Sequence, residues 1–294
     1  MTPSPPAKIL ITGAGGQLGL ELQATAPATK QVVACDSGVL DVTDARAVER
    51  VVQRERPAVV INAAAYTGVD AAEREADRAQ ATNAAGAAYV AEAAGRAGAR
   101  VIHVSTDFVF DGTQGRPYAP TDQPNPLGVY GRTKLAGEQA VQRCTPSAVI
   151  VRTAWVYSMH GHNFVLKMLR VMEERDEVSV VSDQVGAPTW SRSLAAALWA
   201  AVGCPDLRGI YHWTDAGVAS RYDFAVAIQE EALAVGLLSR AVPIRPVQTH
   251  EYPTPARRPA FSVLDTGATR TALGMTAPHW RVNLRHMLRE LRGG

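Results

Sequence analysis

The chain has 294 residues, of which 47% are hydrophobic and 20% are charged, and its formal net charge is +2. This balance is that of an ordinary globular protein, and the lack of basic clusters excludes nucleic acid or another polyanion as the expected partner. No run approaches the ~20 apolar residues of a membrane span, and residues 1–6 contain no apolar signal core. Cys35, Cys144 and Cys204 lie far apart without metal-binding spacing, which indicates free thiols, so we expect a soluble cytoplasmic protein.

Short apolar runs alternate with alanine-rich segments of helical period through the first half of the chain. This alternation predicts an α/β fold with a doubly wound, parallel sheet of the Rossmann type. Thr43-Asp44 and Asp70 are expected to cap the second and third helices. The predicted strands cover residues 8–12, 31–35, 58–62, 100–105 and 148–152, and the predicted helices cover residues 18–26, 44–56, 71–97 and 129–143.

The second half has a different character, with prolines clustered near residues 186–189 and 243–259. Helices are expected after Asn163, from about Ser191, from Ser220 and over residues 280–291, with a strand at 209–213. We therefore predict a dinucleotide-binding domain over residues 1–157 and a smaller C-terminal α/β substrate lobe over most of 158–294. Residues 190–214 are expected to return to the main sheet.

A glycine-rich turn follows the first predicted strand, with Gly13, Gly16 and Gly19 in a GxxGxxG spacing around Gln17-Leu18. Glycines allow a sharp turn and close approach of the backbone to a pyrophosphate, whose charge is stabilised by the start of a helix. A purely structural turn is the alternative. The position between a strand and a helix favours a nicotinamide-dinucleotide site.

Further residues extend this predicted cofactor site. Asp36 ends the second strand, where a carboxylate can accept hydrogen bonds from an adenine ribose and would repel a 2′-phosphate; a solvated aspartate is the alternative. Asp41-Val42 could flank the adenine. The segment after the third strand supplies small side chains beneath the cofactor and includes Ala65, Tyr66 and Thr67.

Three residues form the predicted catalytic set. Tyr130 and Lys134 are spaced i,i+4 on one helix face, and Thr106 ends the fourth strand at the edge of the sheet where ligands bind. The ammonium is expected to lower the pKa of the phenol, which can then donate a proton to a carbonyl oxygen that Thr106 orients. A YxxxK pair on a helix surface without function is the alternative.

These residues resemble the extended short-chain dehydrogenase/reductase superfamily, and within it the dTDP-4-dehydrorhamnose reductase family. The segments that carry the likeness span nearly the whole chain. They are residues 16–19, 62–67 with 69–70, 105–112, 126–138, 152–157, 163–164, 183–189 and 252–259.

The resemblance implies reduction of the 4-keto group of dTDP-6-deoxy-L-lyxo-4-hexulose to dTDP-L-rhamnose, the last step of dTDP-rhamnose biosynthesis, with NADPH or NADH. It implies that Tyr130 is the proton donor, Lys134 its ribose-binding partner and Thr106 the hydroxyl that orients the carbonyl. The cofactor positions implied are Gly16, Gln17, Leu18, Asp36, Asp41, Val42, Ala65, Tyr66 and Thr67, and the substrate positions are Thr106, Asp107 and Trp155.

Other residues leave alternatives open. Arg258 could bind the diphosphate or be a surface charge, and Trp155 could be purely structural. Phe108 stands where related dehydratases carry a carboxylate, which favours reduction over elimination of water. Asp36 and the family's usual preference for NADPH point in different directions, so use of both coenzymes is expected.

Assembly and metal binding are also left open by the resemblance. Some family members dimerise through magnesium held by interface glutamates, which would make this chain a homodimer. Ala119-Pro120 stands where a Tyr-x-Glu is common, and no full ligand set can be placed, so no metal residue is assigned. His160 and His162 lack carboxylate or cysteine company and indicate a solvated loop.

Two other functions remain as hypotheses. One is a reductase or epimerase that acts on another sugar nucleotide. The other is a non-catalytic NAD(P)-binding regulatory subunit, as relatives of this fold serve for methionine adenosyltransferase. The complete set of Thr106, Tyr130 and Lys134 argues against the second.

Overall fold

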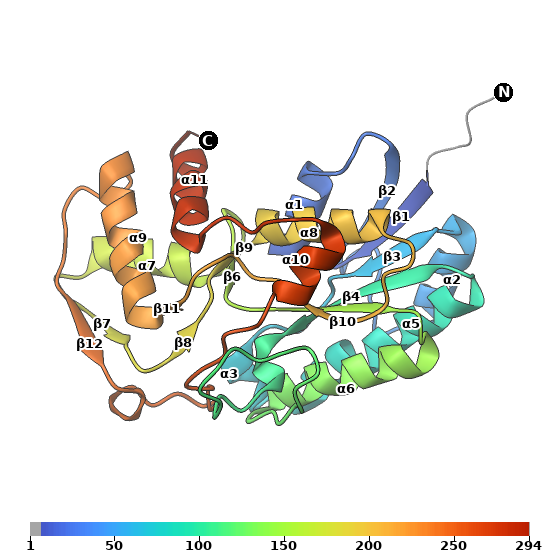
Figure 1. The fold of residues 1–294 in the computed structure, drawn as a ribbon, viewed down its shortest axis with the longest axis horizontal. Helices are drawn as coiled ribbons and strands as arrows, with labels where there is room; N and C mark the ends of the chain where they lie inside the picture. Colours follow the sequence, from blue (N-terminus) through green and yellow to red (C-terminus); the bar gives the residue numbers. More distant parts are fainter. Residues whose placement is uncertain (1–6, 294) are drawn as a thin grey trace.

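The computed structural model describes residues 7–293, so residues 1–6, with the expected lack of a signal core, lie outside the described part. At its centre is a six-stranded sheet of order β10-β5-β4-β3-β1-β2 in which every neighbouring pair is parallel (Figure 1). The chain crosses from β2 back past β1 to β3, so a crevice opens at the carboxyl ends of β1 and β3. The strands are β1 (Ala7–Thr12), β2 (Lys30–Cys35), β3 (Val59–Asn62), β4 (Arg100–Thr106), β5 (Val149–Thr153) and β10 (Gly209–His212).

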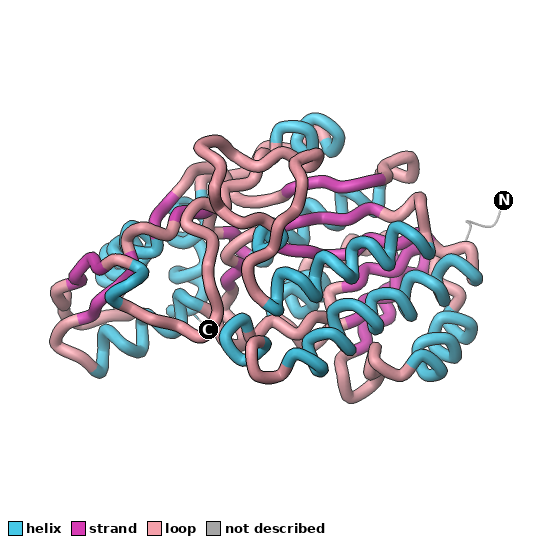
Figure 2. Tube along the Cα trace, turned by 90° about the horizontal axis from the view of Figure 1, so that it is seen from below, coloured by secondary structure: helices cyan, strands magenta, loops and turns pink. Residues whose placement is uncertain are grey.

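Helices cover both faces of this sheet (Figures 1 and 2). α1 (Gln17–Ala24), α8 (Ser191–Gly203) and α10 (Gly267–Leu273) lie on one face, and α2 (Ala45–Glu55), α5 (Ala87–Arg96) and α6 (Val129–Cys144) lie on the other. Successive residues of β1 alternate between the two layers: Ile9 and Ile11 pack with α1 and α8, and Leu10 packs with α2 and α5. All three are fully buried, which explains why the strands are apolar throughout.

A smaller lobe has its own core around Met172, Phe224 and Leu284. It lies to the left in Figure 1. Asn163 caps its first helix, and Ser220 with Asp223 forms a capping box at its second, as the predicted helix starts require. Its helices are α7 (Phe164–Glu174), α9 (Arg221–Val235) and α11 (Trp280–Gly293), and its paired strands are β6 (Val156–Tyr157) with β9 (Thr189–Trp190), β7 (Val178–Val181) with β12 (Ile244–Val247), and β8 (Val185–Gly186) with β11 (Ala219–Ser220). One short 3-10 turn, η3 (Thr249–Glu251), follows β12.

The single helix predicted over 71–97 is wrong. The segment forms α3 (Val69–Ala72), α4 (Ala76–Gln80), a π-helical stretch η1 (Ala81–Gly86) and then α5. Within η1, the Asn83 side chain accepts a hydrogen bond from the Tyr66 amide (2.8 Å) and donates to the Tyr66 carbonyl (3.1 Å) and the Thr133 hydroxyl (3.1 Å). The π-helical turn thus carries a side chain that fastens the segment after β3 to α6.

The two predicted caps in the first half have different outcomes. Asp44 accepts hydrogen bonds from the amides of Arg46 and Ala47 and caps α2, so this prediction is confirmed. Asp70 lies inside α3 and does not cap it. Its carboxylate instead pairs with Arg258 at 2.7 Å, because a charged tertiary partner satisfies it better than a four-residue helix.

An ion pair lies in the interior between α6 and β5. Arg152 donates to both carboxylate oxygens of Glu138 at 2.9 and 2.7 Å, and each side chain is only 1% exposed. The Arg152 guanidinium also lies over the Phe110 ring at 5.1 Å. The two buried charges therefore compensate one another in bidentate geometry.

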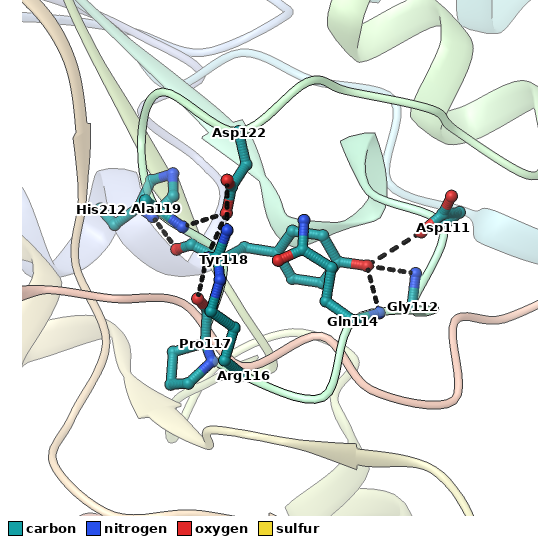
Figure 3. Close-up of polar contacts among 9 residues, drawn as sticks. All are labelled: Asp111, Gly112, Gln114, Arg116, Pro117, Tyr118, Ala119, Asp122 and His212. Carbon is teal, nitrogen blue, oxygen red and sulfur yellow. Dashed lines mark hydrogen bonds and ion pairs between the residues drawn. The ribbon is translucent and has the colours of Figure 1, made fainter.

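The loop between the 3-10 turn η2 (Asp107–Val109) and α6 is held by polar contacts (Figure 3). The Tyr118 hydroxyl donates to Asp111 at 2.9 Å and accepts from the Gly112 amide at 2.9 Å. Arg116 and Asp122 form a bidentate pair at 2.8 Å, and the ring nitrogen Nδ1 of buried His212 lies 3.0 Å from the Tyr118 carbonyl. These contacts tie the loop that leads from the sheet edge into α6 to strand β10.

No helix within residues 7–293 has both the length and the apolar character needed to cross a bilayer.

Candidate active site

A cavity of about 800 Å³ opens at the carboxyl edge of the sheet, lined by residues from the sheet and from the smaller lobe. It brings together every site residue predicted from the sequence except Tyr66. These residues are Gly13, Gly16, Gln17, Leu18, Gly19, Asp36, Asp41, Val42, Ala65, Thr67, Thr106, Asp107, Tyr130, Lys134, Trp155 and Arg258.

The exception, Tyr66, lies outside the lining of the cavity. Asn83 holds its backbone, and the Arg78 guanidinium lies 5.6 Å from the centre of its ring. Its neighbours Ala65 and Thr67 do line the cavity. The backbone of this segment therefore follows the cavity wall while the aromatic ring turns toward α4.

The glycine turn forms one end of the cavity. Gly13 has a φ of +70°, and a Cβ atom there would lie 2.6 Å from the Ala64 backbone nitrogen, so only glycine fits between β1 and the segment after β3. Gly16 precedes α1 and provides no side-chain cap. The amides of the first turn of α1 therefore remain available, an arrangement that fits a pyrophosphate.

Asp36 lies at the same end of the cavity. Its Oδ1 atom accepts hydrogen bonds from the amides of Gly38 and Val39, each at 2.9 Å. Asp41 is fixed in a similar manner by the Thr43 amide and hydroxyl at 2.9 and 2.8 Å. The carboxylate of Asp36 is thus held in place with its second oxygen available, as hydrogen bonding to a ribose hydroxyl requires.

The predicted catalytic residues Thr106, Tyr130 and Lys134 all line the cavity. The Tyr130 ring packs edge-to-face on Phe108, with centroids 5.6 Å apart. Lys134 is 2% exposed, and its ammonium donates to the Val104 carbonyl at 2.7 Å. The Thr106 hydroxyl donates to Asp107 at 3.0 Å and accepts from the Phe108 amide at 3.2 Å.

The pKa of Tyr130 is raised to about 12 because burial disfavours the phenolate; the Thr106 hydroxyl acts in the opposite direction. The expected lowering by Lys134 is therefore not found. The ammonium bonds to a backbone carbonyl, and its own pKa is lowered to about 8 by burial, which Glu138 partly opposes. Desolvation of the phenol is the dominant effect, and the Asp107 carboxyl also raises the pKa. The phenol is therefore protonated at neutral pH, the state a proton donor needs.

Three polar atoms that line the cavity have no hydrogen-bond partner among residues 7–293. They are Ser105 Oγ, Asp107 Oδ2 and Thr153 Oγ1. Burial raises the pKa of Asp107 to about 6, while the neighbouring hydroxyls of Ser262 and Thr106 act to lower it. Buried polar groups rarely stay unpaired, so these atoms fit a polar ligand such as a sugar. Ser105 is the last residue but one of β4 and Thr153 is the last of its neighbour β5, so their position at strand ends is a signal that could have found them in the sequence.

Trp155 forms the wall that faces the smaller lobe. Its φ is +47°, one of two positive values at non-glycine residues in the described part of the chain. A Cβ atom on Gly186 would lie 2.6 Å from the indole, so the ring packs directly on that backbone. The guanidinium of Arg221 stacks on the Trp155 ring. Arg221 also lines the cavity, and no pattern in the sequence indicated it as a site residue.

Gln17 joins the glycine turn to the smaller lobe. Its side-chain oxygen accepts hydrogen bonds from the Ser158 hydroxyl at 3.1 Å and the Asn163 amide at 3.0 Å. His162 lines the cavity beside it.

Within residues 7–293, no group of three or more His, Cys, Asp or Glu side chains is arranged to hold a metal ion.

The ionisation of Lys134 gives a testable pH dependence. Because its pKa lies at about 8 and that of Tyr130 at about 12, the lysine charge is lost first as the pH rises. We expect kcat/KM for the coenzyme, which reports the free enzyme, to fall above about pH 8. Initial rates from pH 6 to 10 measure this, and a profile that stays flat to pH 10 would contradict a role for the Lys134 charge.

Comparisons with known proteins show which family this chain belongs to. The model of the RmlD substrate binding domain family matches residues 7–292. The dTDP-4-dehydrorhamnose reductase of Aggregatibacter actinomycetemcomitans is 41% identical over 288 residues, covering 96% of this chain and 98% of the relative. The chain belongs to the dTDP-4-dehydrorhamnose reductase family.

Other members of the dTDP-4-dehydrorhamnose reductase family agree in sequence and structure. That of Mycobacterium tuberculosis strain H37Rv is 44% identical over 280 residues, covering 93% of this chain and 90% of the relative. The crystal structure of the Bacillus anthracis enzyme in complex with NADP superposes with a TM-score of 0.92 at 37% identity, covering 97% and 99% of the two chains. The predicted family and the Rossmann-type fold are thereby confirmed.

Proposed function

We propose that this protein reduces the 4-keto group of dTDP-6-deoxy-L-lyxo-4-hexulose to dTDP-L-rhamnose with NADPH or NADH, the last step of dTDP-rhamnose biosynthesis. The observation that carries the proposal is one cavity containing the glycine turn, Thr106, Tyr130 and Lys134. Relatives named dTDP-4-dehydrorhamnose reductase match over nearly the whole chain.

Each catalytic residue has a task that its surroundings support. A bound nicotinamide coenzyme supplies the hydride. Tyr130, protonated because its pKa is about 12, donates its proton to the substrate oxygen. The Thr106 hydroxyl orients the carbonyl and shares the charge of the forming alkoxide, and Lys134 is the ribose-binding partner of Tyr130.

Binding is divided between two parts of the chain in this proposal. The domain proposed over residues 1–157, with 190–214 returned to the sheet through β10, holds the coenzyme. Most of 158–294 forms the substrate lobe, which contributes His162, Arg221 and Arg258 to the cavity lining. The resemblance to family members supports a homodimer, and the composition supports a cytoplasmic location. The ordered carboxylate of Asp36 supports use of NADH, and the NADP complex of the Bacillus anthracis enzyme supports use of NADPH.

The proposal is tested with purified protein, the dTDP-linked 4-keto-6-deoxy sugar and either coenzyme. We expect the absorbance of the reduced nicotinamide to fall with both coenzymes, and NMR of the product to identify dTDP-L-rhamnose. Turnover only with a sugar linked to another nucleotide would replace the proposed substrate. Tight coenzyme binding without turnover of any keto sugar would favour the regulatory hypothesis.

A further inference from the structure

Arg221, the first residue of α9, lies in the wall of the cavity with its guanidinium stacked on aromatic rings. The guanidinium carbon lies 3.5 Å from the centroid of the Trp155 ring and 5.2 Å from that of Phe164. Trp155 is itself fixed against the backbone of Gly186. Stacking leaves the edge of the planar guanidinium, which carries its N–H donors, free to bind another group.

The charge of Arg221 lacks a bonded partner in the described part of the chain. The charged groups that act on it are the Asp107 carboxyl, which does so only through space, and the like charge of Arg258. Burial is the main cause that lowers the pKa of Arg221 to about 9; Asp107 acts to raise this pKa and Arg258 acts to lower it. The side chain is therefore a cation at neutral pH in a place that disfavours cations, and an anion bound there would relieve this cost.

Arg258 differs from Arg221 in this respect. It pairs with Asp70 at 2.7 Å and also donates to the Thr254 hydroxyl at 2.5 Å and the Ala256 carbonyl at 3.1 Å. Its donors are thus largely occupied by the protein. Of the two arginines in the cavity wall, Arg221 has its donors available to a ligand.

We propose that Arg221 binds the diphosphate of the sugar nucleotide and is a substrate-binding residue of this site. The inference rests on the proposed function, because a nucleoside diphosphate sugar brings an anion to this part of the cavity. A guanidinium suits a diphosphate, because its N–H groups donate to phosphate oxygens in a bidentate manner. Thr106 and Asp107 line the same cavity, and the Asp107 carboxyl is near enough to act on the charge of Arg221, so the diphosphate would be held close to the reacting sugar.

The test is calorimetric titration of the protein, saturated with NADPH, with dTDP and with thymidine. Arg221→Met keeps an apolar side chain on Trp155 and removes the charge, whereas Arg221→Lys keeps the charge. We expect Arg221→Met to bind dTDP roughly 10- to 100-fold more weakly, with thymidine affinity unchanged, because charge-assisted hydrogen bonds are lost. Arg221→Lys is expected to retain part of the affinity for dTDP.

Two controls separate this inference from others. Arg245→Met removes an arginine that is 64% exposed on β12, outside the cavity lining, and is expected to leave both affinities unchanged. Arg258→Met should weaken dTDP binding less than Arg221→Met does. Equal losses for dTDP and thymidine in Arg221→Met would show that Arg221 only supports the wall, and would overturn the inference. So would unchanged dTDP affinity in Arg221→Met.

The outcome for the unaltered protein distinguishes the two proposals. If it binds neither dTDP nor the keto sugar, the proposed function fails and the inference fails with it. If it binds dTDP and Arg221→Met binds it equally well, the inference alone fails. The kinetic counterpart is a rise in KM for the sugar nucleotide with little change in kcat.

Discussion

Replacement of Tyr130 with phenylalanine is expected to lower kcat by roughly 10²–10⁴-fold, the usual contribution of a positioned proton donor. The change removes one oxygen and keeps the ring, which packs on Phe108 at a centroid distance of 5.6 Å. Folding and coenzyme binding should therefore be preserved. Steady-state rates with the keto sugar at saturating NADPH measure the effect.

The matched control for this variant is Tyr89→Phe. Tyr89 lies on α5 outside the cavity lining, so loss of its hydroxyl should leave kcat unchanged. If Tyr130→Phe turned over substrate as fast as the unaltered protein, Tyr130 would have no part in proton transfer. The proton would then have to come from another group of the cavity.

Replacement of Glu138 with alanine is expected to destabilise the fold by about 3–5 kcal/mol, because it leaves a buried charge without its partner. Glu138 and Arg152 are each 1% exposed and form two hydrogen bonds. Without Glu138 the guanidinium has no carboxylate in a region that water does not reach. Urea unfolding followed by circular dichroism measures the loss.

Two comparisons show whether the loss comes from the unpaired charge. Glu174→Ala breaks an exposed pair with Arg170, whose side chains are 69% and 63% exposed, and should cost less than about 1 kcal/mol. The double change Glu138→Leu with Arg152→Met removes both charges and should recover much of the stability. A Glu138→Ala variant no less stable than Glu174→Ala would contradict this account.

Most of the sheet could be predicted because its strands are buried on both faces and thus apolar throughout. The five runs predicted in the first half became β1 to β5, and the predicted strand at 209–213 became β10. The helix predicted over 71–97 failed for a tertiary reason: local propensity favours one helix, but Asn83 bonds to Tyr66 and Thr133 across three elements. Short strands such as β7 and β12 form because two distant segments pair with one another. The composition of each segment alone does not reveal such a pairing.

The site was predictable where function depends on the ends of strands and on helix spacing. Thr106 at a strand end and the i,i+4 pair of Tyr130 and Lys134 needed only local rules to be placed together. No sequence motif marks Arg221 as a site residue, because its contact with Trp155 joins two segments that are 66 residues apart in the sequence. The pKa shift of Tyr130 was predicted with the wrong sign, since burial and the hydrogen bond of Lys134 to Val104 are properties of the folded protein.

The left-handed backbone at Trp155 limits how this enzyme can change through evolution. A φ of +47° at a residue with a large side chain costs roughly 1–3 kcal/mol. Glycine would relax the backbone at the expense of the indole, and other side chains would keep the strain while giving up the fit to Gly186. Changes in the shape of the cavity would therefore have to arise at positions surrounding the indole, which is a fixed part of the cavity wall.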